Sequence, residues 1–413
     1  MKILLLTDAF PPEIRSSSHL MFELAEDLCT RGHGVEVVTC APRYNLPAPM
    51  PARPRGWVTR ERFARFEVTR VRTPAIHNVG HWRRGLGQLL LPLAFYAAGR
   101  HRAPPDVILT YSPPLTLGVA SHWLARRWRV PFVFNVQDLF PQNAIDLGAL
   151  HNPLLIAFFR ALERFLYHRA AAIVLHSDGN AAWVRCLGID SAKLHVIPNW
   201  ADTQRHRPET RQAANSFRTR LGLEDRFVVL FAGVMGYAQD METIVEAAAH
   251  LADQPRPLFL LVGDGSERPR VERRLGELGL ANVRLLPFVP REDYPALVAS
   301  SDVGLVTLKN TMRTPVVPSK LQSFMASGLP VILSLNEQSD AWNIVRQADC
   351  GLLVPPGRPA ELAAAIRRLG DDPAWGAALG ARGRQYALQH FDRRACVDKC
   401  EKLFAACSRQ PLG

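Results

Sequence analysis

Short apolar runs alternate with helical patterns along the chain. The first run, Lys2–Thr7, precedes a loop and then a stretch from His19 to Arg31 with apolar residues at helical spacing; Val35–Thr39 is the next run. Runs that are apolar throughout are typical of parallel strands covered by helices on both faces. Because a strand, a helix and a second strand within about 40 residues form a βαβ unit, the N-terminal sequence predicts a parallel sheet.

The alternation continues to the end of the chain with one interruption. The pattern breaks near Ile197–Asp202 and a polar stretch follows, so we place a domain boundary there. The predicted fold class is α/β, with two Rossmann-like doubly wound domains facing a central cleft. We predict an N-terminal domain over residues 1–202, a second domain over 203–385, and a C-terminal helix over 386–413, within the helical stretch Trp375–Cys407, that crosses back to the first domain. The other predicted strands are Val107–Thr110, Phe132–Val136, Ala172–Leu175, Phe227–Phe231, Leu258–Val262, Val283–Leu286, Val303–Thr307 and Pro330–Leu335.

Composition narrows the class of protein. Of 413 residues, 47% are hydrophobic and 21% charged, which excludes a disordered or fibrous chain. The seven cysteines include no Cys-x-x-Cys pair, which argues against a disulfide framework or a structural zinc site and fits a reducing compartment. No apolar run reaches the ~18 residues that a spanning helix needs. We therefore expect a cytoplasmic protein, either soluble or attached to a membrane only at its surface.

Positive charge is concentrated in one segment. The chain carries 50 Lys and Arg against 38 Asp and Glu, a formal net charge of +12, and nine of the arginines lie between Pro51 and Leu90. A solvated loop, an anionic membrane surface and a nucleic acid are all compatible with such a segment.

Two apolar stretches are bracketed by cations. Leu86–Gly99 is too short to span a bilayer, and Asn152–Arg169 carries apolar residues with arginines alongside. Both patterns fit interfacial segments, and both also fit core helices of the first domain. The cations that we assign to a membrane surface or an acceptor are Arg83, Arg84, Arg100 and Arg102.

Loops that follow predicted strands offer places for phosphate. Phe10–Ser18 brings serine hydroxyls to a helix start, and Phe231–Glu242 contains glycines that allow close backbone approach before a helix. Gly263–Gly265 is a further glycine turn. None of these loops is a GxGxxG or Walker sequence, so ordinary turn glycines are an equal alternative. The candidate phosphate-binding residues are Ser17, Ser18, Gly233 and Gly236.

The most specific segment of the chain is Val316–Val331, which reads VVPSKLQSFMASGLPV. It resembles the nucleotide-sugar-binding region of the retaining GT-B glycosyltransferases of family 4. It is most similar to the branch written Pro-Ser-Lys-x-x-Glu-Tyr-Met-Ala-Ser-Gly-x-Pro, which includes fucosamine-type transferases of O-antigen and capsule synthesis. Further motifs of the family follow one another almost from end to end. They are Thr7–Glu13, Leu28–His33, Val136–Pro141, Ile197–Trp200, Gly233–Gly236, Val262–Gly265 and Ser301–Asp302.

The resemblance implies a retaining transfer of a sugar, expected to be of N-acetylhexosamine type, from a nucleoside diphosphate-sugar, expected to be a UDP-sugar. The expected acceptor is a polyprenyl-diphosphate-linked glycan at the anionic inner-membrane surface, in surface polysaccharide synthesis. No metal or other cofactor is implied, because helix N-termini and cations can stabilise the leaving diphosphate. No nucleic acid is expected as a partner.

The resemblance also assigns site residues. Lys320 is the cation for the diphosphate, and Asp138, directly after the strand Phe132–Val136, and Glu13 are the candidate catalytic residues. Asp138 has an alternative role as the cap of the following turn. The remaining candidates are Ser319 and Ser323 for the nucleotide, and Gly263, Asp264, Gly265, Pro318 and Gln322 for the donor sugar and ribose.

Two departures from the family concern the donor site. Members carry a glutamate two residues before the Met of the motif, where it contacts the ribose, and many have another eight residues upstream; here these positions are Ser323 and Pro315. Gln322 is adjacent but points from a different side of the helix. Many members also have an Arg and a Lys around the glycine loop, which this chain lacks. A changed donor or reduced activity would follow.

Three other functions fit parts of the pattern. A catalytically impaired GT-B domain that acts as a binding or scaffold subunit is favoured by the missing glutamates. A nucleotide-sugar 2-epimerase would share the fold but lacks the first-loop and Pro-Ser-Lys pattern. A nucleic-acid binder rests on charge alone, without a recognised motif. The 13 histidines show no metal-binding spacing.

Overall fold

The computed structural model describes residues 1–413 except 44–45, 47–55, 64, 75–80, 209–216 and 410–413, and except the side chains of 81–84. Two compact units divide the chain. Unit 1 comprises Met1–Pro198 together with Cys396–Gly413, and unit 2 comprises Asn199–Ala395. The prediction of two α/β domains, with a C-terminal helix that returns to the first, is confirmed.

Unit 1 is built on a sheet whose described strands follow the order β3-β4-β2-β1-β5-β6-β7-β8. All neighbours are parallel except β3, which runs antiparallel to β4. The parallel strands are apolar on both faces because helices cover both sides. The strands are β1 (Lys2–Thr7), β2 (Gly34–Cys40), β3 (Val58–Arg62), β4 (Glu67–Val71), β5 (Val107–Ser112), β6 (Phe132–Val136), β7 (Ala172–Leu175) and β8 (Leu194–Val196).

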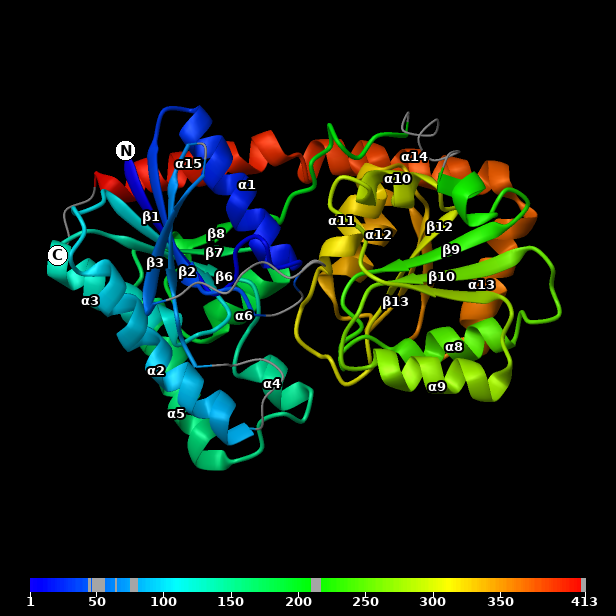
Figure 1. Ribbon diagram of the computed structural model, residues 1–413, viewed down its shortest axis with the longest axis horizontal. Coiled ribbons are helices and arrows are strands. Elements are labelled where there is room, and N and C mark those ends of the chain that lie inside the picture. The colour runs from blue at the N-terminus through cyan, green and yellow to red at the C-terminus, as the bar shows by residue number, and fades with distance from the viewer. Residues whose placement is uncertain (44–45, 47–55, 64, 75–80, 209–216, 410–413) are drawn as a thin grey trace. The chain divides into compact units, whose positions relative to one another are not determined.

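Helices cover the two faces of this sheet (Figure 1). One face is covered by α2, α3, α5 and α6, which contribute Leu91, Leu124, Leu166 and Val184 to a shared apolar cluster. The helices α1 and α15 lie on the other side of the sheet. The helices that pack in unit 1 are α1 (Ser16–Thr30), α2 (His81–Gly99), α3 (Leu117–Trp128), α4 (Gln142–Asp146), α5 (Pro153–Arg169), α6 (Asp178–Cys186), the 3-10 turn η1 (Ser191–Lys193) and α15 (Arg393–Ser408).

Unit 2 is built on a parallel sheet with the order β11-β10-β9-β12-β13-β14. The register places β9 between β10 and β12, so the loops that follow these three strands meet at one edge. The strands are β9 (Phe227–Ala232), β10 (Pro257–Val262), β11 (Val283–Leu286), β12 (Val303–Thr307), β13 (Val331–Ser334) and β14 (Gly351–Val354). The helices are α8 (Met241–Ala249), α9 (Arg268–Leu278), α10 (Tyr294–Ala299), α11 (Ser319–Ala326), α12 (Asp340–Ala348), α13 (Pro359–Asp371) and α14 (Pro373–His390).

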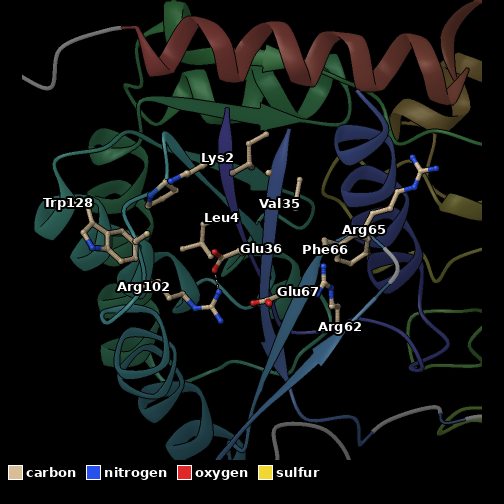
Figure 2. A pocket seen from close by; sticks show the side chains of 14 residues that line it. Lys2, Leu4, Val35, Glu36, Arg62, Arg65, Phe66, Glu67, Arg102 and Trp128 are labelled. Carbon is tan, nitrogen blue, oxygen red and sulfur yellow. Dashed lines mark hydrogen bonds and ion pairs between the residues drawn. The ribbon is translucent and has the colours of Figure 1, made fainter. Parts of the chain in front are cut away.

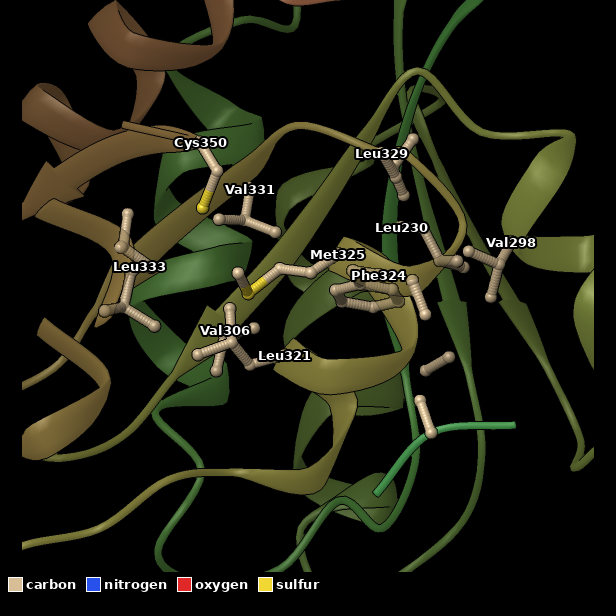
Figure 3. Packing of buried hydrophobic residues seen from close by; sticks show 14 of the residues in the cluster. Leu230, Val298, Val306, Leu321, Phe324, Met325, Leu329, Val331, Leu333 and Cys350 are labelled. Carbon is tan, nitrogen blue, oxygen red and sulfur yellow. The ribbon is translucent and has the colours of Figure 1, made fainter. Parts of the chain in front are cut away.

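The short helix α11 is fixed firmly on this sheet. Its residues Leu321, Phe324 and Met325 are fully buried in the cluster that Figure 3 shows. A Cβ atom at Gly304 of β12 would lie 2.3 Å from the Phe324 ring, so helix and strand touch closely. Burial of this apolar side fixes α11 on the sheet, and Lys320, in the first turn of the helix, is thereby held close to Gly233 at the carboxyl end of β9.

Part of the basic segment is not a solvated loop, which is one of the three interpretations that its sequence allows. Described residues of this segment form β3 and β4, an antiparallel pair at the edge of the sheet. Arg70 is buried, where its Nε donates to Glu61 at 2.8 Å and its Nη2 to the carbonyl of Pro11. Arg53 and Arg55 lie outside the described residues. An edge strand that carries arginines escapes a search for apolar runs.

Candidate functional site

Two glycine turns of unit 2 pack backbone against backbone at the carboxyl edge of the sheet. Gly263 has a φ of +144°, and a Cβ there would lie 1.9 Å from the carbonyl oxygen of Gly233. Gly265 has a φ of +152°, and its Cβ would lie 2.4 Å from the carbonyl oxygen of Met235. The Met235 N–H donates to Asp264 at 2.8 Å, which joins the two turns. Only glycine fits here, so these turns form a fixed floor.

Lys320 lies directly over this floor. Its Nζ is 4.2 Å from the centre of the Phe231 ring and 3.6 Å from the point where a Cβ of Gly233 would lie. Surrounding protein removes water from the ammonium group and lowers the pKa of Lys320 to about 8. No carboxylate among the described residues forms an ion pair with it. A cation in this position is suited to an anionic group of a ligand.

The side chains next to Lys320 on α11 serve different purposes. Ser323, at the family's glutamate position, donates to the Lys320 carbonyl at 3.0 Å and shares a 3.2 Å hydrogen bond with the hydroxyl of Tyr294. Gln322 is 1% exposed and faces the core, so it cannot replace the glutamate. Ser319 is exposed at the first turn, and Pro318 immediately precedes the helix.

The carboxyl edge of unit 1 holds a cluster of charges. Asp138, directly after β6, is exposed, whereas Glu13 is only 5% exposed. Glu13 accepts from the Arg43 N–H at 2.8 Å and pairs with Arg15 at 3.6 Å. Burial, together with the nearby charge of Asp138, raises the pKa of Tyr111 and keeps its phenol neutral. In unit 1, Asp138 is thus accessible to a ligand and Glu13 holds the loop together.

Ser17 and Ser18 do not present their hydroxyls to a ligand. Both lie in the first turn of α1 and are buried, Ser18 completely. The prediction of serine hydroxyls at a phosphate site is wrong because the helix turns these side chains toward the core. Arg15 precedes the helix without a side-chain cap, so backbone N–H groups are the polar groups of this turn.

Comparisons with known proteins identify the family. Residues 20–200 match the glycosyl transferase 4-like domain, and residues 226–372 match glycosyl transferases group 1. The two matches cover both units. The chain belongs to the GT-B glycosyltransferases of family 4.

Relatives of this glycosyltransferase cover nearly its full length. WcaI of Escherichia coli strain K12, which carries the name colanic acid biosynthesis glycosyl transferase, is 25% identical over 382 residues, 89% of this chain and 92% of WcaI. WbjE of Pseudomonas aeruginosa, named as a glycosyltransferase, is 27% identical over 331 residues, 80% of this chain and 81% of WbjE. The structure of Anabaena HepE in complex with UDP-glucose has a TM-score of 0.73 at 19% identity and covers 98% of this chain and 100% of that one. This likeness shows the GT-B fold.

The cations assigned to a membrane have different positions in this glycosyltransferase. Arg100 is exposed after α2. The side chain of Arg102 is only 7% exposed, pairs with Glu36 and donates to Thr69, so its assignment to a membrane surface is wrong. Arg83 and Arg84 belong to α2, but their side chains lie outside the described residues.

A cavity of about 410 Å³ lies at the amino edge of the unit 1 sheet, where β1, β2 and β4 begin (Figure 2). Arg62, Arg65 and Arg102 contribute to its lining, and Arg102 forms its ion pair with Glu36 there. The carboxyl edge with Asp138 is the opposite edge of the same sheet. Doubly wound sheets bind substrates at the carboxyl ends of their strands, so this cavity is separate from the candidate site.

Exposed apolar side chains are concentrated on three helices of unit 1. Ring contacts between Tyr96 and Trp123, at 5.7 Å, and between His122 and Phe165, at 5.1 Å, place α3 between α2 and α5. The exposed residues are Leu86, Leu89, Leu90 and Leu93 on α2, Trp123 on α3, and Leu154, Leu155, Phe158 and Phe165 on α5. None of the described helices is long and apolar enough to cross a membrane.

Sequence reasoning missed two residues at the carboxyl edge of the unit 2 sheet. Lys309 follows β12, and its N–H donates to the Ala238 carbonyl of the glycine loop, Gly233–Asp240 after β9. The hydroxyl of Tyr294 shares a hydrogen bond with Ser323. The position of Lys309 just after the predicted strand Val303–Thr307 was the available signal, because strand ends meet at the ligand edge. Within the described part of the chain, no group of three or more His, Cys, Asp or Glu side chains is placed to hold a metal ion.

Proposed function

We propose that this glycosyltransferase moves an N-acetylhexosamine-type sugar, with retention, from a UDP-sugar to a lipid-linked glycan in bacterial surface polysaccharide synthesis. The observation that carries the proposal is the ammonium group of Lys320 over the Gly233 turn. The name of WcaI, a colanic acid biosynthesis glycosyl transferase, supports a role in surface polysaccharide synthesis. The UDP-glucose complex of HepE supports the donor class.

The donor half of the reaction belongs to unit 2. The leaving UDP gains negative charge as the sugar–phosphate bond breaks. Lys320 and the amino end of α11 offer positive charge at the same place, which lowers the energy of the transition state without a metal ion. The Gly233 and Gly263 turns let the diphosphate approach the backbone closely. We accordingly expect transfer to continue in excess EDTA.

The acceptor half belongs to unit 1. The exposed carboxylate of Asp138 is suited to accept hydrogen bonds from sugar hydroxyls of the acceptor or donor. Glu13 supports the loop that precedes α1 through Arg43 and Arg15. Replacing Asp138 by Asn keeps the shape and removes the charge, so its effect on turnover tests the assignment.

The exposed helices of unit 1 support attachment to a membrane surface. The apolar side chains of α2 and α5 stand beside exposed arginines, among them Arg160 and Arg164. Glu163 is the one acidic residue in the sequences of α2, α3 and α5; it is buried, and burial raises its pKa to about 7. An anionic surface attracts each exposed cation by about 1 kcal/mol, and a lipid-linked acceptor is anchored in that surface.

One experiment tests the transferase directly. Purified protein is mixed with each of a panel of UDP-, GDP- and dTDP-sugars and a bacterial membrane extract, and release of the free nucleoside diphosphate is measured. We expect release from UDP-sugars with wild type, a loss of at least tenfold with Lys320→Met, and no change with Lys402→Met, an exposed lysine of α15. Failure of the wild type to bind any of the three nucleotides would contradict the proposal.

The second candidate function is a binding subunit with impaired catalysis. The observation that favours it is the engagement of Ser323 with Tyr294 and the Lys320 carbonyl, where the family has a free carboxylate. Tight binding of UDP together with no transfer to any acceptor fraction would support this candidate over the enzyme.

A further inference from the structure

Lys309 is joined to the glycine loop by the backbone. It follows β12, which is the neighbour of β9 in the sheet. Its N–H donates to the carbonyl of Ala238 at 2.9 Å, so the segment after β12 is fixed against the loop after β9. The Met312 N–H donates to the Lys309 carbonyl at 3.1 Å and closes a turn behind it. The backbone of Lys309 is thus held in place by the donor edge, by which we mean the carboxyl edge of the unit 2 sheet where the loops after β9, β10 and β12 meet.

The side chain of Lys309 lies over an aromatic ring of the same loop. Its Nζ is 3.6 Å from the centre of the Tyr237 ring, and Tyr237 is 56% exposed. No carboxylate in the described part of the chain pairs with Lys309. A cation over an exposed ring is held more weakly than a cation against a phosphate, so an anionic ligand can draw it away.

The two lysines of this edge border different ends of one loop. Lys320 lies at Gly233, the first residue after β9, whereas Lys309 lies at Tyr237, near the start of α8. Lys309 lies in the segment after β12 and Lys320 in the first turn of α11, which follows that segment. The glycine loop itself contains no Lys or Arg. The positive charge of the donor edge is therefore supplied from the β12 side.

We propose that Lys309 is a second diphosphate-binding residue, which rests on the Tyr237 ring and moves to the phosphate when a nucleoside diphosphate binds. The proposal rests on the proposed function, because it requires a nucleotide donor at this edge. Lys309 replaces the loop cations that many family members carry. Tyr237 acts as a positioning residue that keeps the ammonium group close to the loop.

The test compares ligands that differ in their phosphates. Binding of UDP, UMP and uridine is measured by isothermal titration calorimetry with wild type, Lys309→Met, Lys309→Gln and Lys309→Arg, and with Lys402→Met as the matched control. We expect both neutral variants to bind UDP about tenfold more weakly, the Arg variant to stay within about threefold of wild type, and uridine affinity to be unchanged. Tyr237→Phe should retain UDP affinity, because the ring remains.

Each outcome separates this inference from the function on which it rests. If wild type binds UDP and Lys309→Met and Lys309→Gln bind it equally well, Lys309 has no part in the site and the inference is overturned. An equal loss of UDP and uridine affinity would also overturn it, since a phosphate contact cannot weaken a ligand without phosphate. If wild type binds no nucleotide at all, the proposed function fails first. Thermal unfolding of each variant confirms that the protein is folded.

Discussion

At the scale of single residues, the donor edge depends on positions where no side chain fits. Gly263 combines a left-handed φ with a carbonyl oxygen in the place of a Cβ, and that oxygen belongs to Gly233, the residue beneath Lys320. Any side chain at Gly263 must push the two turns apart. The floor of the site and the stability of unit 2 are therefore linked at this residue.

Gly263→Ala should destabilise unit 2 by about 2–4 kcal/mol, because strain from the positive φ adds to a backbone clash. Gly279→Ala is the matched control: it has a φ of +61° but open space around its Cβ, so about 1 kcal/mol is expected. Thermal unfolding and UDP titration measure the two effects. Equal costs for the two variants would show that the contact with Gly233 adds nothing.

The pKa of Lys320 predicts the pH dependence of nucleotide binding. Burial disfavours the charged form of Lys320, so its ammonium group loses its proton near pH 8. Below that pH the cation is present and holds the diphosphate; above it the attraction is lost. UDP affinity should fall severalfold between pH 7 and 9.5 at constant ionic strength. Lys320→Arg should keep a flat profile, since arginine stays charged; a flat wild-type profile would contradict the assignment.

How far the sequence predicts the site depends on what each residue contacts. The sequence brings Lys320 and the glycines to attention because the Pro-Ser-Lys segment and the glycine turns are local features next to strand ends; their binding of a diphosphate stays a prediction. Ser18 and Arg102 were misassigned because their burial is decided by distant packing: Ser18 faces the core, and Arg102 meets Glu36 across the sheet. Lys309 contributes through contacts to another loop, which no local pattern records.

At the scale of elements, α5 is a helix with several exposed apolar side chains. It starts with Asn152, whose side chain accepts from the Leu154 and Leu155 N–H groups, and Pro153 fits the first turn. Among its seventeen residues only Glu163, Leu166 and Tyr167 are buried. Leu154, Leu155 and Phe158 in its first half are exposed, whereas Phe159 packs against the core cluster.

Replacing Leu154 and Phe158 together by Ser should weaken binding to anionic vesicles at least tenfold and leave thermal stability nearly unchanged, because both side chains are exposed. Vesicle sedimentation with and without anionic lipid measures the binding. Leu278→Ser, at an exposed leucine of unit 2, is the control and should bind as wild type does. Binding by the double variant that equals wild type would exclude α5 from the membrane surface.

The sequence predicts elements whose own residues carry the apolar pattern, and it misses boundaries that contacts with distant residues determine. Lys2–Thr7 and Phe132–Val136 match β1 and β6 because buried parallel strands are apolar on both faces. The predicted stretch Trp375–Cys407 is two helices, α14 and α15. It breaks where Ala201 pairs with Asp392, whose side chain also accepts from the Ala395 N–H. Ala201 is remote from Asp392 in the sequence, so the pattern around the break does not record this contact. Asp392 itself is of a residue type that commonly precedes a helix.

At the scale of the whole molecule, the last helix completes the first unit. Arg31 pairs with Asp398 and Glu401, and His33 contacts Glu401 at 2.7 Å, so the turn after α1 is fixed to α15. These exposed pairs contribute little energy each. The larger contribution comes from the apolar side of α15, where Phe404 is fully buried.

Phe404→Ala should lower the stability of unit 1 by about 3–5 kcal/mol, as expected for removal of a buried aromatic ring. Lys402→Ala, on the exposed side of the same helix, should change it by less than about 0.5 kcal/mol. Scanning calorimetry of the full chain measures both. Equal melting curves for the two variants would mean that α15 is not part of the core of unit 1.

The return of α15 has a consequence for how the chain is made. Unit 2 is one continuous stretch, so it can fold as soon as the ribosome has released it, whereas unit 1 receives its closing helix only after all of unit 2 has been synthesised. While unit 2 is translated, residues 1–198 therefore lack α15, and the face of the sheet that this helix covers stays exposed. An expression fragment that stops at Pro198 should aggregate, and one that joins residues 396–413 to it through a flexible linker should be soluble.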